Sequence, residues 1–198
     1  MKPFRCKYLV AVLEDPADFK NIGTVIRNAN ALGVEKVYVI DPRMNLPEKW
    51  EDMRQTKAMS STSVSAVKWT FVKRFTSTQE CITHLHKKGY ASVATSPHVK
   101  GKRNILLHDG DYTTDPKLAV WFGNESKGLS PEAIEHCHTC VSIPMFGMVE
   151  SLNLGTSSGI VLCEVARQRR AYQSQFRSKG RRGEREVHLP ITIARESK

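Results

Sequence analysis

Short apolar runs alternate with amphipathic segments along most of the chain. Residues 7–13 and 34–40 are apolar runs of strand length, and an Asp-Pro pair follows shortly after each of them. Between these runs, apolar residues recur at helical spacing, which predicts a helix that Asn21 caps and that Gly33 ends. These apolar residues are Ile22, Val25, Ile26, Ala29 and Leu32. A strand, a helix and a second strand form a βαβ unit, so we expect the two strands to be parallel.

The same alternation continues through the rest of the chain and predicts an α/β protein. Residues 43–63 are polar and predict a loop with a helical segment. The remaining expected strands lie at 64–75 (one or two strands), 90–95, 118–122 and 141–145, and the remaining expected helices lie at 78–88, from Pro131, and from about Leu152 past Tyr172. The last helix begins with small residues from Gly155 to Gly159. A glycine inside a helix costs about 1 kcal/mol relative to alanine, so we expect that a neighbour needs the space.

Length and composition fit one globular domain of 198 residues, 40% of them hydrophobic. No apolar run reaches the roughly 18 residues that span a bilayer, and the N-terminus lacks a signal-peptide pattern, so the expected location is cytoplasmic. The 5 cysteines are scattered, which argues against a disulfide scaffold. The segment HCHTC at 136–140 offers zinc ligands, but the second CxxC or the downstream histidine pair of a zinc finger is missing. No metal site is therefore expected.

The net charge of +10 is concentrated in the C-terminal part of the chain. Residues 165–198 contain ten Lys and Arg against three Glu, whereas residues 1–164 contain 20 basic against 17 acidic residues. On composition alone, a solvated face or a frayed tail explains such a run as well as a functional arm does. A basic arm also favours polyanions, because binding to phosphates releases their counterions.

Three loops follow expected strands at their carboxyl ends, where open α/β sheets bind ligands. They contain the sequences EDPADFKNIGTVIRN, FGNESKGLS and PMFGMVESLN. Neither a GxxxxGK(S/T) phosphate loop nor a GxGxxG fingerprint is present, so a Walker or Rossmann nucleotide site has no support. Taken singly, Arg27 and Glu125 fit ordinary surface residues, and Asn153 fits the start of a helix.

Taken together, the three loops resemble the signature motifs of the TrmH family of RNA ribose 2′-O-methyltransferases, in the SPOUT superfamily. The matching residues are Asn21, Gly23, Arg27 and Gly33 in the first motif, Gly123, Glu125, Gly128 and Leu129 in the second, and Ile143–Met145, Ser151–Asn153 and the small residues after them in the third. Their order and spacing agree from about residue 8 to residue 172. The particular likeness is to the tRNA (guanosine-2′-O)-methyltransferases of the family.

The resemblance implies a mostly parallel sheet with helices on both faces and a deep trefoil knot formed by the C-terminal segment. It divides the chain into a methyltransferase domain at 1–172 and a basic tail at 173–198. In a knot, the small residues of the last helix would allow close packing, and the family dimerises near this region. The implied cofactor is S-adenosyl-L-methionine, held largely by backbone groups. The implied cofactor-binding residues are Ala94, Thr95, Ser96, Gly123, Asn124, Glu125, Ile143, Met145, Ser151 and Leu152.

The resemblance also implies the catalytic residues. Arg27 would come from the opposite subunit of a homodimer and be oriented by Glu125, with Ser151, Asn153 and Asn21 positioning groups nearby. A guanidinium has a pKa above about 12 and cannot accept a proton while it is charged. Two roles for Arg27 therefore remain open: a base whose proton is displaced by its surroundings and the RNA phosphate, or a clamp that holds the phosphate and stabilises the developing alkoxide.

RNA, and tRNA in particular, is the implied partner, with a D-loop guanosine as the expected target. The basic segment 98–103 and the tail are candidates for phosphate contacts. The tail candidates are Arg167, Arg169, Arg170, Arg177, Lys179, Arg181 and Arg182. Many guanosine-specific members of the family carry helical extensions at both ends, whereas this chain begins close to its first strand and has a short tail. Ribosomal RNA and other positions of tRNA therefore remain open as targets.

Two alternatives from other classes are a non-catalytic RNA-binding protein of this fold and a methyltransferase for proteins or small molecules. The complete set of motif residues argues against the first, and the basic tail argues against the second.

Overall fold

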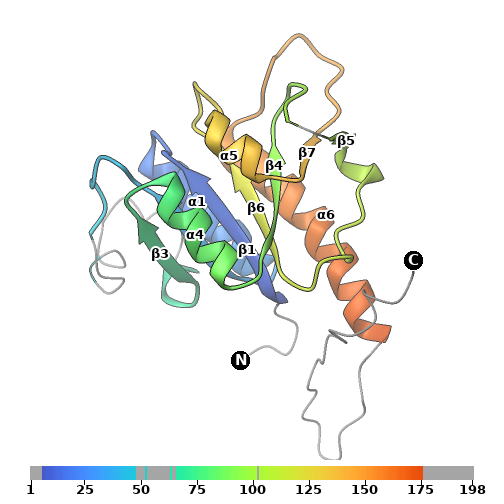
Figure 1. Ribbon diagram of the computed structural model, residues 1–198, viewed down its shortest axis with the longest axis horizontal. Helices are drawn as coiled ribbons and strands as arrows, with labels where there is room; N and C mark the ends of the chain where they lie inside the picture. The colour runs from blue at the N-terminus through green and yellow to red at the C-terminus, as the bar shows by residue number, and fades with distance from the viewer. Residues whose placement is uncertain (1–5, 48–51, 53–62, 64–65, 102, 176–198) are drawn as a thin grey trace, which may run out of the picture.

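Seven parallel strands form one sheet in the order β3-β2-β1-β6-β4-β7-β5 (Figure 1). This computed structural model describes residues 6–47, 52, 63, 66–101 and 103–175. The strands are β1 (Cys6–Glu14), β2 (Val34–Ile40), β3 (Phe71–Phe75), β4 (Ala91–Thr95), β5 (Asn104–Leu106), β6 (Leu118–Phe122) and β7 (Thr139–Ser142). Among the described helices, none is long and apolar enough to cross a membrane.

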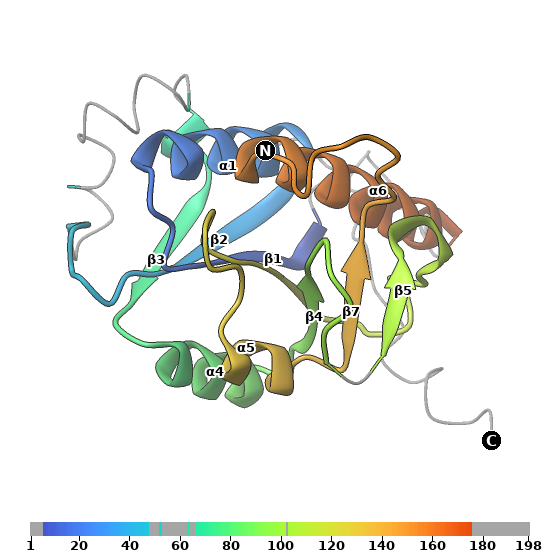
Figure 2. The same ribbon diagram turned by 90° about the horizontal axis from the view of Figure 1, so that it is seen from above.

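Helices cover both faces of the sheet (Figure 2). The helices α1 (Phe19–Ala31) and α6 (Leu154–Gln175) lie on one face, and α4 (Thr78–Lys87) and α5 (Pro131–His136) lie on the other. Side chains of β1 alternate between the two cores, because successive residues of a strand point to opposite faces. The central strand β6 is buried along its whole length, as expected for a parallel sheet that is covered on both sides.

Most of the predicted elements are confirmed, and β2 and β6 have the predicted bounds. Other bounds differ by one or two residues, and three larger differences concern α1, β7 and β5. The helix α1 begins at Phe19 and is capped by Asp18, not by Asn21. The strand β7 ends at Ser142, before the predicted end at residue 145. The short strand β5 was not predicted at all and directly follows the basic segment 98–103. Within 64–75, the described residues form a 3₁₀ turn, Ala66–Lys68, and β3. Most of the loop predicted at 43–63 lies outside the described residues.

The C-terminal part of the chain passes through a closed loop of the chain. Residues 96–117 connect β4 to β6, and these two strands are paired, so the connection forms a ring that includes β5. The strand β7 lies between β4 and β5 and therefore inside this ring. It is preceded by α5 on one face of the sheet and followed by α6 on the other face (Figure 2). The chain thus crosses from one face to the other through its own loop.

Small residues let α6 pack closely against α1. A Cβ atom at Gly155 would lie 2.6 Å from Cγ2 of Thr24, a distance that side chains do not tolerate without movement. The Nδ2 group of Asn28 donates hydrogen bonds to the carbonyl of Gly155 (2.7 Å) and to the hydroxyl of Ser158 (3.3 Å). Ser158 is fully buried. The small residues are therefore needed where the first turns of α6 contact α1 within one subunit.

Arg169 of α6 belongs to the fold rather than to the predicted RNA-binding tail. Its side chain is buried, and its guanidinium donates hydrogen bonds to the carbonyls of Tyr112 (2.8 Å), Asp115 (2.9 Å) and Pro116 (2.6 Å). The neighbouring Gln168 bonds to the same connection through Gly110 and Tyr112. The prediction that Arg169 contacts phosphates is wrong, because its donors face the ring that α6 has passed through.

Two other predicted tail residues are also partnered. Arg170 donates to the carbonyl of Leu32 at the end of α1 (2.6 Å), and Arg167 forms an exposed ion pair with Glu164 (2.7 Å). The helix α6 continues to Gln175, and the other predicted tail residues, from Arg177 onward, lie outside the described residues.

Candidate active site

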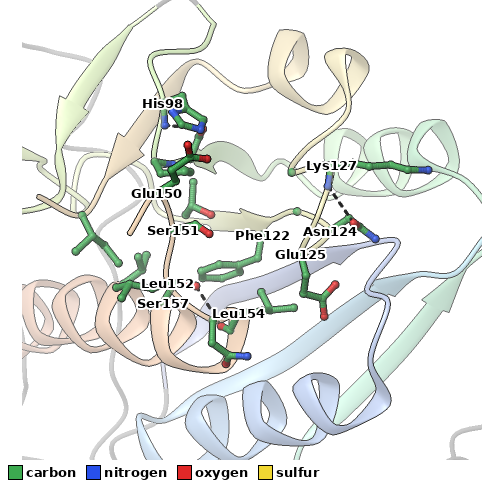
Figure 3. Close-up of a pocket in the computed structure, with 18 of the residues that line it drawn as sticks. His98, Phe122, Asn124, Glu125, Lys127, Glu150, Ser151, Leu152, Leu154 and Ser157 are labelled. Carbon is green, nitrogen blue, oxygen red and sulfur yellow. Dashed lines mark hydrogen bonds between the residues drawn. The ribbon is translucent and has the colours of Figure 1, made fainter. Parts of the chain in front are cut away.

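A cavity of about 420 Å³ lies at the carboxyl ends of β4, β6 and β7 (Figure 3). Three segments line it. The first runs from the last residue of β4 into the following loop (95–98 and Lys100), the second runs from the last residue of β6 into the following turn (122–128), and the third consists of residues that lie between Ile143 and Leu154 after β7. The start of α6 closes it with Ser157 and Val161. The cavity thus lies where the threaded segment passes the ring, at a position where the strands of open α/β sheets present their ligands.

The cavity combines apolar walls with a polar rim. Ile143, Met145 and Leu152 are only half-buried and line the cavity, so their apolar surface faces the open space. This explains why the apolar run that begins in β7 continues beyond the strand: after Ser142 its apolar residues line the cavity instead of entering the sheet. Apolar walls of this kind suit a purine ring.

The residues predicted to bind the cofactor are brought together by the fold. With one exception they line this cavity, and the exception is Ala94. Ala94 is fully buried in the core between the sheet and the helices α4 and α5. Sequence reasoning missed other lining residues, among them Phe122 at the end of β6 and Ser157 in α6. The position of Phe122 at the carboxyl end of a central strand was the available signal for it.

The loop after β6 is a rigid turn. The backbones of Asn124 and Gly128 exchange two hydrogen bonds (3.0 and 2.9 Å), and Gly128 adopts a φ of +69°, which favours glycine. Oδ1 of Asn124 accepts hydrogen bonds from the N–H groups of Ser126 and Lys127, and its Nδ2 donates to the carbonyl of Asp15 (2.7 Å). A Cβ at Gly123 would lie 2.2 Å from the backbone of Gly128. These contacts fix the residue between them, Glu125, at the edge of the cavity.

The carboxylate of Glu125 is the centre of a hydrogen-bond network between the first and second loops. Its oxygens accept from the N–H groups of Ala17 (2.8 Å) and Asp18 (3.4 Å) and from Nδ2 of Asn21 (2.7 Å). Partial burial opposes ionisation of Glu125, but the bonds from Ala17, Asn21 and Asp18 outweigh it and lower the pKa of this carboxyl. Glu125 is therefore held in its anionic form near neutral pH.

Asn21 connects Glu125 to the start of α6. While its Nδ2 donates to Glu125, its Oδ1 accepts from Nδ2 of Asn153 (3.1 Å). Oδ1 of Asn153 in turn accepts from the N–H groups of Gly155 (2.8 Å) and Thr156 (3.3 Å), as an N-capping side chain does. This arrangement explains why Asn21 does not cap α1: its side chain is the link between two other segments.

The predicted catalytic residues therefore converge, with one exception. Glu125, Asn153 and Ser151 line the cavity, and Asn21 bridges the first two. Arg27 does not reach this cluster. It lies exposed on α1, and within the described part of the chain it has no hydrogen-bond or ion-pair partner. The site within one subunit thus contains anionic and amide groups without the predicted arginine.

The HCHTC segment is packed into the fold. Nε2 of His136 lies 3.0 Å from the hydroxyl of Ser92, which also accepts a hydrogen bond from Nε1 of Trp121. Cys137 and Cys140 are buried, and burial raises the pKa of both thiols, so they are not poised as thiolates. In the regions that the structure describes, no group of three or more potential ligands is arranged to hold a metal ion. All five cysteines are free.

A parallel sheet threaded by its own C-terminal segment, with a cavity at the crossing, defines the class of knotted α/β RNA methyltransferases. Comparison with known proteins supports this class. Residues 8–163 match the SpoU rRNA Methylase family, and the chain belongs to this family. It is thus an RNA 2′-O-methyltransferase that uses S-adenosylmethionine, and the passage of β7 through the ring is the knot of the family.

Individual relatives have different RNA substrates in their names. The chain is 28% identical over 165 residues to the tRNA (guanosine(18)-2′-O)-methyltransferase of Aquifex aeolicus. This alignment covers 83% of this chain and 72% of the relative. It is 34% identical over 160 residues to a 23S rRNA (guanosine-2′-O-)-methyltransferase of Shewanella oneidensis, and there it spans only 59% of the relative.

Solved structures agree with the fold and with the cofactor. The crystal structure of the Aquifex aeolicus TrmH/SpoU tRNA modifying enzyme superposes with a TM-score of 0.71 at 26% identity, covering 86% of this chain and 79% of that one. The SpoU methyltransferase AviRb from Streptomyces viridochromogenes, solved in complex with AdoMet, gives a TM-score of 0.68 at 26% identity, covering 85% and 63%. The cavity described here fits that cofactor, because its volume of about 420 Å³ lies within the usual range of roughly 300–1,000 Å³ for small-molecule sites and its apolar walls suit adenine.

Proposed function

We propose that this protein methylates the 2′-hydroxyl of a guanosine in the D loop of tRNA and that it acts in the cytoplasm as a homodimer. The observation that carries the proposal is the hydrogen-bonded chain Glu125–Asn21–Asn153 at the edge of the cavity, which joins all three motif loops. The target is supported by relatives named tRNA (guanosine(18)-2′-O)-methyltransferase, at 28% identity in Aquifex aeolicus and 30% in Escherichia coli.

The exposed position of Arg27 supports a dimer with shared active sites. An arginine on the outer surface of α1 that lacks a partner in its own described chain is available to a second subunit. Glu125, which is ionised and lies at the cavity edge, is a suitable acceptor for Arg27 of the partner subunit. We infer that each site is completed by the other subunit in this way.

Each residue of the site then has a separate role in methyl transfer. The bound cofactor supplies an electrophilic methyl group. Asn21 and the N–H groups of Ala17 and Asp18 fix the Glu125 carboxylate, which orients the guanidinium of Arg27. That guanidinium holds an RNA phosphate and stabilises the negative charge that develops on the ribose 2′-oxygen as its proton passes to solvent, while Ser151 positions groups at the rim. Holding the reactants in line contributes several kcal/mol to the rate acceleration, roughly up to 7–11 in favourable cases.

Mixed dimers test the shared site. One subunit carries Arg27→Ala and the other Glu125→Gln, and the two are co-expressed with different tags. If Arg27 acts across the interface, each heterodimer keeps one intact site, so a random mixture recovers about a quarter of the wild-type rate. If Arg27 acted within its own subunit, both sites of the heterodimer would be damaged and no activity would return.

Single variants test the role of Arg27. We expect Arg27→Ala and Arg27→Lys to lower kcat by about 100- to 1,000-fold while cofactor binding is retained. Lys87→Ala, an exposed cation on α4 at the other face of the sheet, is the matched control and should keep the wild-type rate. Near-normal activity of Arg27→Lys would contradict both proposed roles of the guanidinium.

A second substrate class has specific support. The relative with 34% identity acts, by its name, on 23S rRNA. A structure concerned with methylation of C/U34 on tRNA superposes with a TM-score of 0.67 and is covered to 97% by this chain at 26% identity. Methylation of unmodified total RNA with labelled S-adenosylmethionine, separation of tRNA from ribosomal RNA, and alkaline hydrolysis distinguish these cases. Label in an alkali-resistant dinucleotide that begins with guanosine, from tRNA only, is the expected result.

The division into a domain at 1–172 and a basic tail at 173–198 remains a prediction. We propose that the tail and the segment 98–103 contact RNA phosphates. Support comes from the charge of the tail and from His98 and Lys100, which line the cavity.

A further inference from the structure

The loop after β7 exposes a group of large apolar side chains. Phe146 is 96% exposed, Met148 is 102% exposed, and Val149 is 63% exposed. We call residues 146–149 the apolar loop. A Cβ at Gly147, in the middle of this loop, would meet no atom within 4 Å, so the loop projects away from the rest of the chain. Contiguous exposed apolar side chains on a globular domain mark an interaction site.

The apolar loop is continuous with the candidate active site. Met145, directly before it, and Glu150 and Ser151, directly after it, line the cavity. In Figure 1 the segment between β7 and α6 extends beyond the carboxyl ends of the strands. The apolar loop therefore joins two lining segments of the cavity and lies at its rim.

The same cavity carries basic side chains on its other lining segments. His98 and Lys100 lie in the loop after β4, and Lys127 lies in the turn after β6. The acidic groups among the lining residues are Glu125 and Glu150. The carboxylate of Glu125 accepts three hydrogen bonds from its own chain and, under the proposed function, orients Arg27 of the partner subunit, and Glu150 is exposed at the rim. The apolar loop thus contributes an exposed aromatic ring, and the other segments around the same cavity contribute Lys100 and Lys127. Aromatic rings and cations in one site are the combination that binds unpaired nucleotides, because bases stack on the ring while cations meet the backbone.

We propose that Phe146 stacks on a base of the RNA substrate next to the methylated ribose, so that the enzyme requires an unpaired target nucleotide. The proposal rests on the proposed function, because it assigns the apolar loop to the RNA of that reaction. A base within a helix is stacked on both sides and cannot present a free face to Phe146. The apolar loop would thus select loops of RNA over duplexes without reading sequence, and Met148 would extend the apolar contact.

Substitution of Phe146 tests the proposal. The probe is an RNA stem–loop with 2-aminopurine at an unpaired loop position, whose fluorescence is quenched on stacking, and the same strand paired with its complement is the duplex control. Phe146→Ala should weaken binding of the stem–loop by roughly 5- to 150-fold and abolish the quenching, whereas Phe146→Trp should keep both. Phe146→Leu, which is apolar but lacks a ring face, should lose the quenching. Trp69→Ala removes another exposed aromatic side chain, before the start of β3, and should change nothing.

Three further measurements can overturn the proposal. If Phe146→Ala converts the dimer to a monomer in light scattering, the apolar loop is an interface between copies of this chain. If it weakens S-adenosylmethionine binding by the same factor as RNA binding, the loop covers the cofactor instead. If wild-type protein binds the duplex as well as the stem–loop, the loop does not select unpaired nucleotides. Failure of the proposed function is distinguishable, because a protein without methyltransferase activity would still show the stacking signal with this probe.

Discussion

Replacement of Arg169 by methionine separates a structural arginine from an RNA-binding one. Arg169 is 3% exposed, and its guanidinium holds the connection between β5 and β6 through the carbonyls of Tyr112, Asp115 and Pro116. Methionine preserves much of the side-chain volume but provides no donor. The variant therefore leaves these three carbonyls without their partner while it perturbs the packing little.

The magnitude follows from the surroundings of each carbonyl. The bond to Tyr112 is buried, so its loss costs about 1–3 kcal/mol, whereas the two partly buried carbonyls can regain water and cost about 0.5–1.5 kcal/mol each. Removal of the guanidinium also brings a gain that offsets part of this loss in stability, because a buried charge is itself costly. Burial lowers the pKa of Arg169, and its Nε has no hydrogen-bond partner among the described residues. The net expectation is a free energy of unfolding lower by about 2–4 kcal/mol, or a Tm lower by roughly 5–15 °C.

Two assays on the same variants decide the matter. Thermal unfolding of Arg169→Met should show the loss, and Arg167→Met, which removes an exposed arginine two positions earlier, should leave Tm unchanged. In RNA binding below the Tm, the slope of log affinity against log salt should be the same for Arg169→Met and wild type. A slope reduced by about 1 with an unchanged Tm would show that Arg169 contacts a phosphate, and the structural reasoning would be refuted.

Three further predictions concern the helix packing, the site and the tail. Gly155→Ala should lower Tm by a few degrees, because the new Cβ would lie 2.6 Å from Cγ2 of Thr24. Gly159→Ala should lower Tm less, because its Cβ would lie 3.2 Å from Nδ2 of Asn28, which needs only a small shift, and alanine favours the helix; equal effects in calorimetry would contradict the packing argument. Because its folded-state pKa is lowered, ionised Glu125 stabilises the fold above the ordinary glutamate pKa of about 4.3, and the stability is lost as pH falls through the lowered value. The difference in Tm between wild type and Glu125→Gln should be constant above about pH 5 and shrink below pH 4; a difference that persists in acid would exclude the charge as its cause. Neutralising three tail arginines should weaken RNA binding and flatten its salt dependence, and an unchanged slope would remove the tail from the binding surface. These arginines are Arg181, Arg182 and Arg185.

The sequence was sufficient to predict those helices and strands in which apolar side chains are buried in the core. The apolar positions of α1 and the runs of β2 and β6 follow directly from helical spacing and from strands buried on both faces. The prediction failed where apolar residues serve a purpose other than packing in the core. Ile143 and Met145 continue the apolar run of β7 because they line a cavity, so β7 was predicted too long. The strand β5 has only three residues, beside a polar segment, and leaves no periodic signal.

The sequence also could not show which residues far apart in the chain form hydrogen bonds with each other. Nothing near Arg169 in the sequence shows that carbonyls more than fifty positions earlier accept its hydrogen bonds. Asn21 looked like a helix cap because amide side chains are common there, but its partners Glu125 and Asn153 lie more than a hundred positions away. The candidate site itself was found through the motif resemblance, whose three segments the fold brings to one cavity.

The passage of β7 through the ring of residues 96–117 makes the folding rate of the protein depend on whether the chain is already threaded. A newly made chain must close the ring and then move its C-terminal end through the opening, so its first folding is limited by a rare, non-local event. Denaturant dissolves hydrogen bonds and cores but does not by itself untie a chain, and the knot is lost only when the end slips back out. Protein that is briefly unfolded should therefore refold faster than protein released from the ribosome, although the two chains are chemically identical.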